Sequence, residues 1–294
     1  MKILITSGGT KIKIDLVRSI TNMSRGTFGS RICDSFWKNL EQNRDEIVFF
    51  YAKDSKMPIA EDLYNEAHDD SVSMIRYIEY DTFDSYREKL TDLLKEEKFD
   101  IIVLAAAVSD YGVKEVFNGK YRSREDEMTI QLVKLQKVIT EVRGLAPEAV
   151  ICGFKLLVNS TDEELMEAIQ KQFDENGIDL CVGNDLRDIK NNNHRLTIVE
   201  DKDYGGSKSI YTKNESECDL SDIVCKHCID VYNKKNHIRN EMNISKIEPP
   251  WSQELSEYME ERYGIDIDEL ICEAIRECED EELRQVMEKR SIKE

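Results

Sequence analysis

A glycine pair, Gly8 and Gly9, stands between Ser7 and Thr10, directly after the short apolar run Ile3–Thr6. Glycines let backbone N–H groups approach an anion closely, and the two hydroxyl groups are further donors. A structural turn explains the same residues at least as well, because glycine is common in turns. The spacing is that of neither the dinucleotide-binding fingerprint nor the P-loop. It therefore argues against redox and kinase activity.

A second group of polar and small residues, Asn22, Ser24 and Gly26, precedes the amphipathic run Arg31–Leu40. We expect a helix over this run, with Ser24 in position to cap it. The first N–H groups of the helix would then face an anion. The alternative is a capped helix start without a ligand, and these residues considered alone favour that alternative.

A third group combines three alanines, Ala105, Ala106 and Ala107, with a carboxylate at Asp110. The alanines end the apolar run Ile101–Ala107, and their small side chains leave room for a ligand at the end of a buried strand. Asp110 would then face ribose hydroxyls or a magnesium ion. Close packing of a helix on the sheet also explains the alanines, but it does not explain a carboxylate at this position.

Elements of two kinds must position these groups, because short apolar runs alternate with longer amphipathic stretches as far as about residue 235. This alternation predicts an α/β fold, a Rossmann-like parallel or mixed sheet flanked by helices on both faces. Ligands are expected at the carboxyl ends of its strands. The predicted strands are Ile3–Thr6, Ile47–Tyr51, Ile101–Ala107, Val150–Phe154, Leu180–Val182 and Leu196–Val199. The predicted helices are Arg31–Leu40, Ser85–Lys98, Asp162–Phe173 and Ser221–Tyr232.

The charge of the chain limits its partners. With 41 basic and 60 acidic residues among 294, the formal net charge is −19. Nucleic acids and anionic membranes need a basic face, so neither is expected as a partner. A nucleotide substrate remains compatible, because a few lysines in a cleft reverse the potential locally. We find no signal peptide and no apolar run that could span a bilayer, and we expect a cytoplasmic protein with reduced thiols.

One cysteine motif resembles a metal or redox site. Cys225-Lys226-His227-Cys228, with Cys218 nearby, has suggestive spacing. It falls within a predicted helix, where Cys225 and Cys228 share a face with apolar neighbours, and no second ligand pair follows at zinc-finger spacing. We therefore interpret these cysteines as buried structural thiols.

The composition changes after His237. Pro249 and Pro250 interrupt the chain, and the remainder is rich in glutamate. We predict a domain over residues 1–237 and a short acidic helical appendage over 238–294, with helices at Glu254–Tyr263 and Asp268–Cys278. A partly ordered tail is the alternative, given the high charge.

Taken together, the three groups resemble one family in order and spacing, the phosphopantothenate–cysteine ligases. The match continues through Gly153–Val158, then Gly183–Leu186, then His194-Arg195 at the start of a late strand. It is closest to the monofunctional bacterial form and covers about residues 1–232.

The resemblance implies a reaction. Such enzymes transfer a nucleotidyl group from CTP or ATP, with Mg²⁺, to the carboxylate of 4′-phosphopantothenate, and the amine of cysteine then attacks the acyl-nucleotide. The chemistry needs positive charge at the α-phosphate and a donor for the acyl oxygen. The resemblance also implies a homodimer, with small molecules as the other partners and neither flavin nor NAD. Neither the preferred nucleotide nor the metal ligands follow from these residues.

Roles for single residues follow only from this resemblance. Asn22 and Lys120 would be catalytic, with Lys120 in a flap over residues 118–127. The implied nucleotide-binding residues are Ala105, Ala106, Asp110, Lys120, Lys137, Phe154 and Lys171. The implied substrate-binding residues are Gly8, Gly9, Thr10, Arg18, Asn22, Ser24, Gly26 and Ala107.

The chain departs from the family pattern at several of its positions. The flap reads Lys120-Tyr121-Arg122-Ser123, with two lysines fewer than usual. Gln136 replaces a proline, Glu175 a basic residue and Gly183 an alanine. These departures motivate an alternative, a catalytically weakened member that acts as a nucleotide-binding or interaction protein through its acidic extension. An NAD-dependent oxidoreductase is disfavoured by the missing glycine fingerprint.

Overall fold

The structure is a computed structural model that describes residues 1–40, 45–59, 75–122, 127–190, 193–213 and 219–244. The chain divides into two compact units, Met1–Asn233 and Lys234–Glu294. The predicted domain boundary after residue 237 falls within the helix α7 (Leu220–Ile244). The helices predicted at 254–263 and 268–278 lie outside the described residues, so the appendage stays a prediction.

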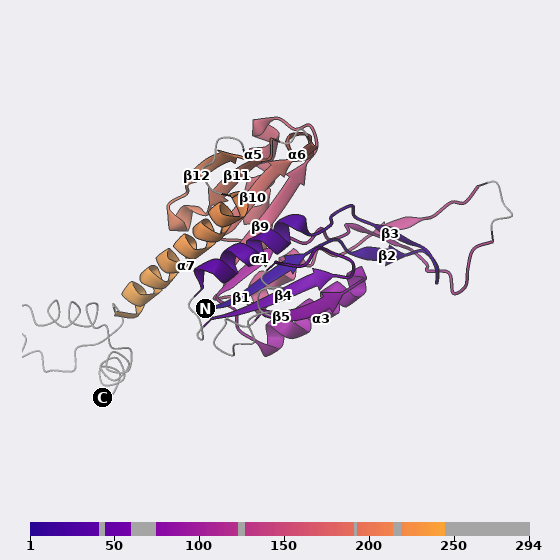
Figure 1. The fold of residues 1–294 in the computed structure, drawn as a ribbon, viewed down its shortest axis with the longest axis horizontal. Helices are drawn as coiled ribbons and strands as arrows, with labels where there is room; N and C mark the ends of the chain where they lie inside the picture. Colours follow the sequence, from indigo (N-terminus) through magenta and orange to yellow (C-terminus); the bar gives the residue numbers. More distant parts are fainter. Residues whose placement is uncertain (41–44, 60–74, 123–126, 191–192, 214–218, 245–294) are drawn as a thin grey trace, which may run out of the picture. The chain divides into compact units, whose positions relative to one another are not determined.

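The described residues form an eight-stranded mixed sheet in the order β12-β11-β10-β9-β6-β1-β4-β5 (Figure 1). Neighbours from β5 to β10 are parallel, and β11 and β12 are antiparallel. The strands are β1 (Lys2–Ser7), β4 (Glu46–Ala52), β5 (Ile75–Tyr80), β6 (Ile101–Leu104), β9 (Val150–Leu157), β10 (Leu180–Asp185), β11 (Arg195–Glu200) and β12 (Lys208–Thr212). The predicted α/β class is confirmed.

Helices cover both faces of the sheet, which explains why its central strands are apolar without alternation. On one face α3 (Phe83–Glu96), α4 (Ile139–Leu145) and α5 (Asp162–Asn176) pack on side chains such as Leu4 and Ile102. On the other face α1 (Thr27–Asn39) and α7 pack on side chains such as Ile3 and Ile101. Capping boxes at Thr82 and Thr161 start α3 and α5. Two short elements, α6 (Leu186–Lys190) and the 3₁₀ helix η1 (Lys202–Tyr204), join the last strands.

Two short hairpin-like pairs form an arm that extends beyond the end of the sheet (Figure 1). We call it the arm: β2 (Lys11–Lys13) pairs with β3 (Ser19–Thr21), and β7 (Tyr111–Val113) pairs with β8 (Leu132–Lys134). Backbone bonds from Leu16 N to Gly119 O and from Phe117 N to Ile14 O tie the segments around the two pairs together. Segments about a hundred residues apart in sequence are thereby linked near the ligand-binding end of the sheet.

Three sequence predictions need correction. The strand predicted over Ile101–Ala107 ends at Leu104, and the alanines form a loop that leaves the sheet edge. The helix predicted from Arg31 starts at Thr27, and its N-cap is Gly26, without a side-chain cap. Ser24 therefore does not cap it; its Oγ instead accepts from Gly26 N at 3.4 Å. The strands β5 and β12 and the arm were not predicted.

The cysteine motif lies on the buried side of α7. Cys225 and Cys228 are in the core, as the sequence predicted. His227 between them is hydrogen-bonded through Nδ1 to Glu200 at 2.8 Å and through Nε2 to the Tyr211 hydroxyl at 3.0 Å. The motif therefore joins α7 to β11 and β12. Across the described part of the chain, we find no helix with the length and apolar character to cross a membrane.

Candidate functional site

A cavity of about 570 Å³ opens at the carboxyl ends of β6, β9 and β10. The loop after β6, the start of α4 and the end of β9 form most of its wall, and α1, α5 and β10 contribute single side chains. Its position is the one expected for a ligand site of a parallel sheet. Seven of the residues that the sequence singled out line it: Ser24, Ala105, Ala106, Ala107, Asp110, Lys137 and Phe154.

The carboxylate of Asp110 is exposed at this cavity and has no hydrogen-bond or ion-pair partner among the described residues. Its backbone is fixed, because Asp110 O accepts from Leu135 N at 2.9 Å. Lys137 and Lys155 line the same cavity. Carboxylate and cations on one cavity can hold the hydroxyls and phosphates of a nucleotide.

Thr10 and Asn22 hold the loop after β6 in place. Asn22 Nδ2 donates to Ala107 O at 2.8 Å, and Thr10 N donates to the same oxygen at 3.1 Å. Thr10 Oγ1 accepts from Ser109 N at 3.0 Å. Neither Thr10 nor Asn22 lines the cavity itself. Their hydrogen bonds to Ala107 and Ser109 fix the position of this part of the cavity wall.

Gly8 and Gly26 stand where both the backbone conformation and the packing require glycine, and their predicted contact with substrate stays a prediction. Both have positive φ, 87° and 71°. A Cβ on Gly8 would lie 2.6 Å from Ala52 Cβ, and one on Gly26 would lie 2.7 Å from Ser7 Oγ. A Cβ on Gly9 would likewise lie 3.1 Å from Asn22 O. The three glycines therefore let the first loop and the start of α1 approach closely, as in the structural alternative.

Arg18 lies on the arm and not at the cavity. Its guanidinium makes two hydrogen bonds to Asp15 Oδ2, at 2.7 and 3.0 Å, and a third to Tyr121 O at 3.0 Å. Tyr121 N donates to the same carboxylate at 3.1 Å. Burial alone would raise the pKa of Asp15, but the bonds from Val17, Tyr121 and Arg18 outweigh it and hold that pKa well below its usual range. Asp15 is buried, and sequence reasoning did not single it out.

Lys120 is the neighbour of this anchored Tyr121. Its side chain is exposed and does not line the cavity. Residues 123–126 of the predicted flap lie outside the described residues. The structure thus shows how the chain beside Lys120 is held, and the role of Lys120 stays a prediction.

Lys171 does not line the cavity, and 66% of its side chain is exposed. It pairs with Glu175 at 3.5 Å, and Glu175 pairs with Lys137 at 3.4 Å. Burial works against the ionised form of Glu175, but the two lysines lower its pKa. The acidic departure from the family pattern therefore lies between two lysines that were predicted to bind the nucleotide.

Sequence reasoning missed several lining residues, including Phe28, Lys155, Gln172 and Asn184. Lys155 follows Phe154 directly, so its place at a strand end was a usable signal. Phe28 packs edge-on against two other rings and forms an aromatic cluster with them. The distance between ring centroids is 6.1 Å to Phe154 and 5.3 Å to His194. Burial, followed by the charges of Arg31 and Lys213, lowers the pKa of His194.

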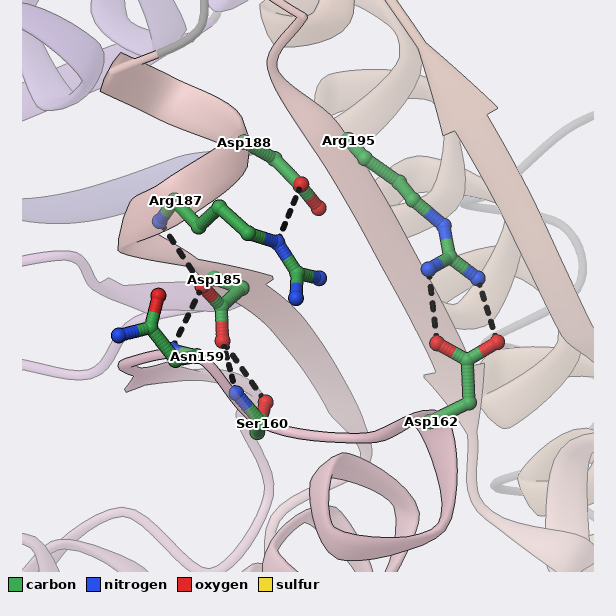
Figure 2. A network of polar contacts seen from close by, with 7 residues as sticks. All are labelled: Asn159, Ser160, Asp162, Asp185, Arg187, Asp188 and Arg195. Carbon is green, nitrogen blue, oxygen red and sulfur yellow. Dashed lines mark hydrogen bonds and ion pairs between the residues drawn. The ribbon is translucent and has the colours of Figure 1, made fainter.

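A second polar network lies beside the cavity (Figure 2). Asp185, at the end of β10, accepts from Asn159 N, from Ser160 N and Oγ, and from Arg187 N, at 2.8 to 3.1 Å. Burial alone would raise the pKa of Asp185, but these bonds outweigh it and hold the pKa well below its usual range. Arg195 forms a two-fold ion pair with Asp162 alongside. Asp185 thereby clamps the loop after β9 to the turn that follows Asn184.

Comparison with known proteins places the chain in a family. The model of the DNA/pantothenate metabolism flavoprotein C-terminal domain matches residues 1–40 and 67–227. The bifunctional coenzyme A biosynthesis protein CoaBC of Thermococcus kodakarensis is 30% identical over 214 residues, which are 73% of this chain and 48% of that protein. CoaBC of Methanocaldococcus jannaschii is 30% identical over 192 residues, 63% of this chain and 40% of that protein. The chain thus spans about half or less of these relatives.

Solved structures show the same fold. The DNA/pantothenate metabolism flavoprotein of Streptococcus pneumoniae superposes with a TM-score of 0.62 at 23% identity, covering 78% of this chain and 97% of that chain. A Cab2 mutant, H337A, in complex with phosphopantothenate-cysteine superposes with a TM-score of 0.65 at 18% identity, covering 81% and 88%. At these identities the likeness establishes the fold.

Proposed function

The chain belongs to the family of the DNA/pantothenate metabolism flavoprotein C-terminal domain, and we propose that it is a phosphopantothenate–cysteine ligase. It would activate the carboxylate of 4′-phosphopantothenate with CTP or ATP and couple it to L-cysteine, a step of coenzyme A biosynthesis. The names of its relatives support this proposal.

One observation in the structure carries the proposal furthest. The cavity at the carboxyl ends of β6, β9 and β10 combines a carboxylate, Asp110, that has no partner within the described part of the chain, with two lysines, Lys137 and Lys155, and an aromatic wall at Phe154. These are the groups that a nucleoside triphosphate needs. The carboxylate accepts from ribose hydroxyls, the lysines offset phosphate charge, and the aromatic ring packs against the base.

In the first step a carboxylate oxygen of phosphopantothenate attacks the α-phosphorus, and pyrophosphate leaves. Lys137 and Lys155 would stabilise the charge that develops on the phosphates. Lys120 would add a third cation when the segment beside Tyr121 reaches the cavity. In the second step the cysteine amine attacks the acyl carbon, and the nucleoside monophosphate leaves. Asn22, which holds the loop at Ala107, would help to position the acyl oxygen.

The residues at the cavity fit a magnesium ion that arrives with the nucleotide. Such an ion needs few protein ligands, and Asp110 offers a carboxylate without a partner among the described residues. Bound Mg²⁺ would offset charge on the triphosphate. The preference between CTP and ATP stays open, with CTP favoured by the resemblance to the bacterial form.

We also propose a homodimer that forms through the arm. Three apolar side chains on or next to the arm are exposed: Leu16 by 68% and Val17 by 65%, in the turn between β2 and β3, and Met23 by 89%, just after β3. Exposed apolar patches of this kind often mark protein interfaces. Light scattering that gave a monomer mass at micromolar concentration would contradict a dimer. A cytoplasmic location belongs to the same proposal.

A second candidate function rests on Glu175. Its pairing with Lys137 and Lys171 removes positive charge from the rim of the cavity. This favours a weakened family member that binds a nucleotide without efficient turnover. The acidic extension over 238–294 would then be its interaction module.

Pyrophosphate release separates the two candidates. Purified protein is incubated with CTP or ATP, phosphopantothenate and Mg²⁺, with and without cysteine. An active ligase releases pyrophosphate only when nucleotide, phosphopantothenate and Mg²⁺ are all present. Nucleotide binding without pyrophosphate release would favour the second candidate.

A further inference from the structure

Gln172 is a polar side chain that the mechanism above does not use. It lies on α5, 9% exposed, and lines the cavity. Its Oε1 accepts from Asn176 Nδ2 at 3.0 Å. Its Nε2 has no hydrogen-bond partner among the described residues. A buried amide therefore offers one free donor at the cavity.

Asn176 occupies one end of this amide. The two residues are four apart on α5, so their side chains lie on the same face of the helix. Asn176 is 4% exposed, and its Oδ1 is buried without a partner. Since the Asn176 amide donates to Oε1, the carbonyl end of Gln172 is occupied and its N–H₂ end is left for a ligand.

The surroundings of Gln172 indicate what it would bind. The helix α4 packs beside α5, and its side chains Ile139 and Val142 line the same cavity. The lysines of the cavity, Lys137 and Lys155, come from other segments. An uncharged amide beside the apolar side chains Ile139 and Val142 suits a ligand group that is flat, uncharged and carries hydrogen-bond acceptors. A heterocyclic base has such acceptors in its carbonyl oxygens and ring nitrogens.

We propose that Gln172 is a specificity-determining residue that donates from Nε2 to an acceptor on the nucleobase of the nucleotide. Asn176 is its positioning residue. This proposal rests on the proposed function, because it takes the ligand of the cavity to be the nucleotide. It extends that function by naming the side chain that recognises the base.

The test compares nucleotides in Gln172→Leu, which keeps the size and removes the donor. Pyrophosphate release is measured with CTP, UTP, ATP and GTP at saturating phosphopantothenate. We expect kcat/KM for the preferred nucleotide to fall about 10- to 100-fold, while the others change less, so that the ratio between nucleotides collapses. Asn176→Ala should lower the same ratio partly. A merely structural role would not change it.

The matched control is Gln170→Leu. Gln170 is exposed on the same helix and pairs with Asp174 at 3.0 Å, also four residues on. Its variant should keep the wild-type ratio. An equal loss for all four nucleotides in Gln172→Leu, or no loss, overturns the proposal even if the wild type is an active ligase.

Failure of the ligase function is seen separately in the wild type. If it releases no pyrophosphate with any nucleotide, the same ratio is measured by calorimetric binding of the four nucleotides. If the wild type prefers one nucleotide in binding and Gln172→Leu abolishes that preference, the result still supports recognition of the base by Gln172. Absence of nucleotide binding, or a preference that survives the substitution, overturns it.

Discussion

The buried carboxylate of Asp15 accepts two hydrogen bonds from the guanidinium of Arg18, and together they hold both backbone polar groups of Tyr121. This pair joins the first arm segment to the residue beside Lys120. The flap that the proposed chemistry needs is therefore anchored at one end by a charge pair from a distant part of the sequence.

Asp15→Asn should loosen this anchor. The amide keeps the size of the side chain, but it places an N–H₂ group where the carboxylate accepted hydrogen bonds from Arg18 and Tyr121. We expect turnover to fall at least about 10-fold, because geometry at the site is sensitive to small displacements. Hydrogen exchange at residues 117–122 should become faster. Asp162→Asn, in the exposed pair with Arg195, is the control. Unchanged exchange in Asp15→Asn would contradict the anchor.

Lys120→Ala tests the flap lysine itself. The side chain is exposed, so its loss should change the free energy of unfolding by less than about 0.5 kcal/mol. Turnover should nevertheless fall about 100-fold or more, because a cation at the phosphates would be lost. Lys114→Ala removes another exposed lysine from the same arm and should leave turnover intact. Wild-type turnover in Lys120→Ala would remove this residue from the mechanism.

Glu175→Gln should free the two lysines that Glu175 contacts. Both pairs are exposed to solvent, so the effect is modest. We expect KM for the nucleotide to fall roughly two- to five-fold, with kcat nearly unchanged. The effect should shrink at high salt because exposed charges are screened. A higher KM would show that Glu175 assists binding and does not oppose it.

Gly183→Ala tests the departure from the usual alanine. A Cβ there would lie 2.6 Å from Ile169 Cδ1 and 3.2 Å from Leu165 Cδ1, so these two side chains of α5 would have to shift. We expect a loss of about 1–3 kcal/mol in the free energy of unfolding, measured with urea. Ile169→Val removes the conflicting atom, and the double variant should recover most of the loss. Additive losses would contradict this explanation.

Asp185→Asn should change how stability depends on pH. The pKa of Asp185 is lower in the folded than in the unfolded chain. Its contribution is therefore complete above the unfolded value of about 3.9 and is lost as pH falls through the folded value. The variant should be less stable than wild type at pH 7, and the gap should narrow below about pH 4. Figure 2 shows the four donors around this carboxylate, two on each oxygen; asparagine keeps one acceptor oxygen and turns an N–H₂ group toward the other two donors. If the stability difference between Asp185→Asn and wild type stayed constant with pH, the charge of Asp185 would not be its cause.

The sequence predicted the sheet better than the surroundings of the site. Buried parallel strands are continuous apolar runs, so β1, β4 and β9 were visible. Arg76 and Glu79 interrupt the apolar residues of β5, and β12 is short and half-exposed. Neither strand therefore shows a continuous apolar run. The arm depends on pairing between distant segments, and no local pattern reports that.

The same limit applies to single residues. Asp110 and Phe154 follow apolar runs, and strand ends converge at one edge of the sheet. Lys171 and Gln172 are neighbours on α5, and only the rotation of that helix decides which one faces the cavity. The family resemblance assigned Arg18 to the substrate, whereas the role of its partner Asp15 becomes visible only through the hydrogen bonds of the folded arm.

The formation of the product tests the ligase proposal most directly. The full chain is incubated with 4′-phosphopantothenate, L-cysteine, Mg²⁺ and either CTP or ATP, and the mixture is followed by mass spectrometry. We predict 4′-phosphopantothenoylcysteine together with an equal amount of the nucleoside monophosphate, and neither when the triphosphate is omitted. Absence of this product with both nucleotides, from protein that is folded and binds nucleotide, would contradict the ligase proposal.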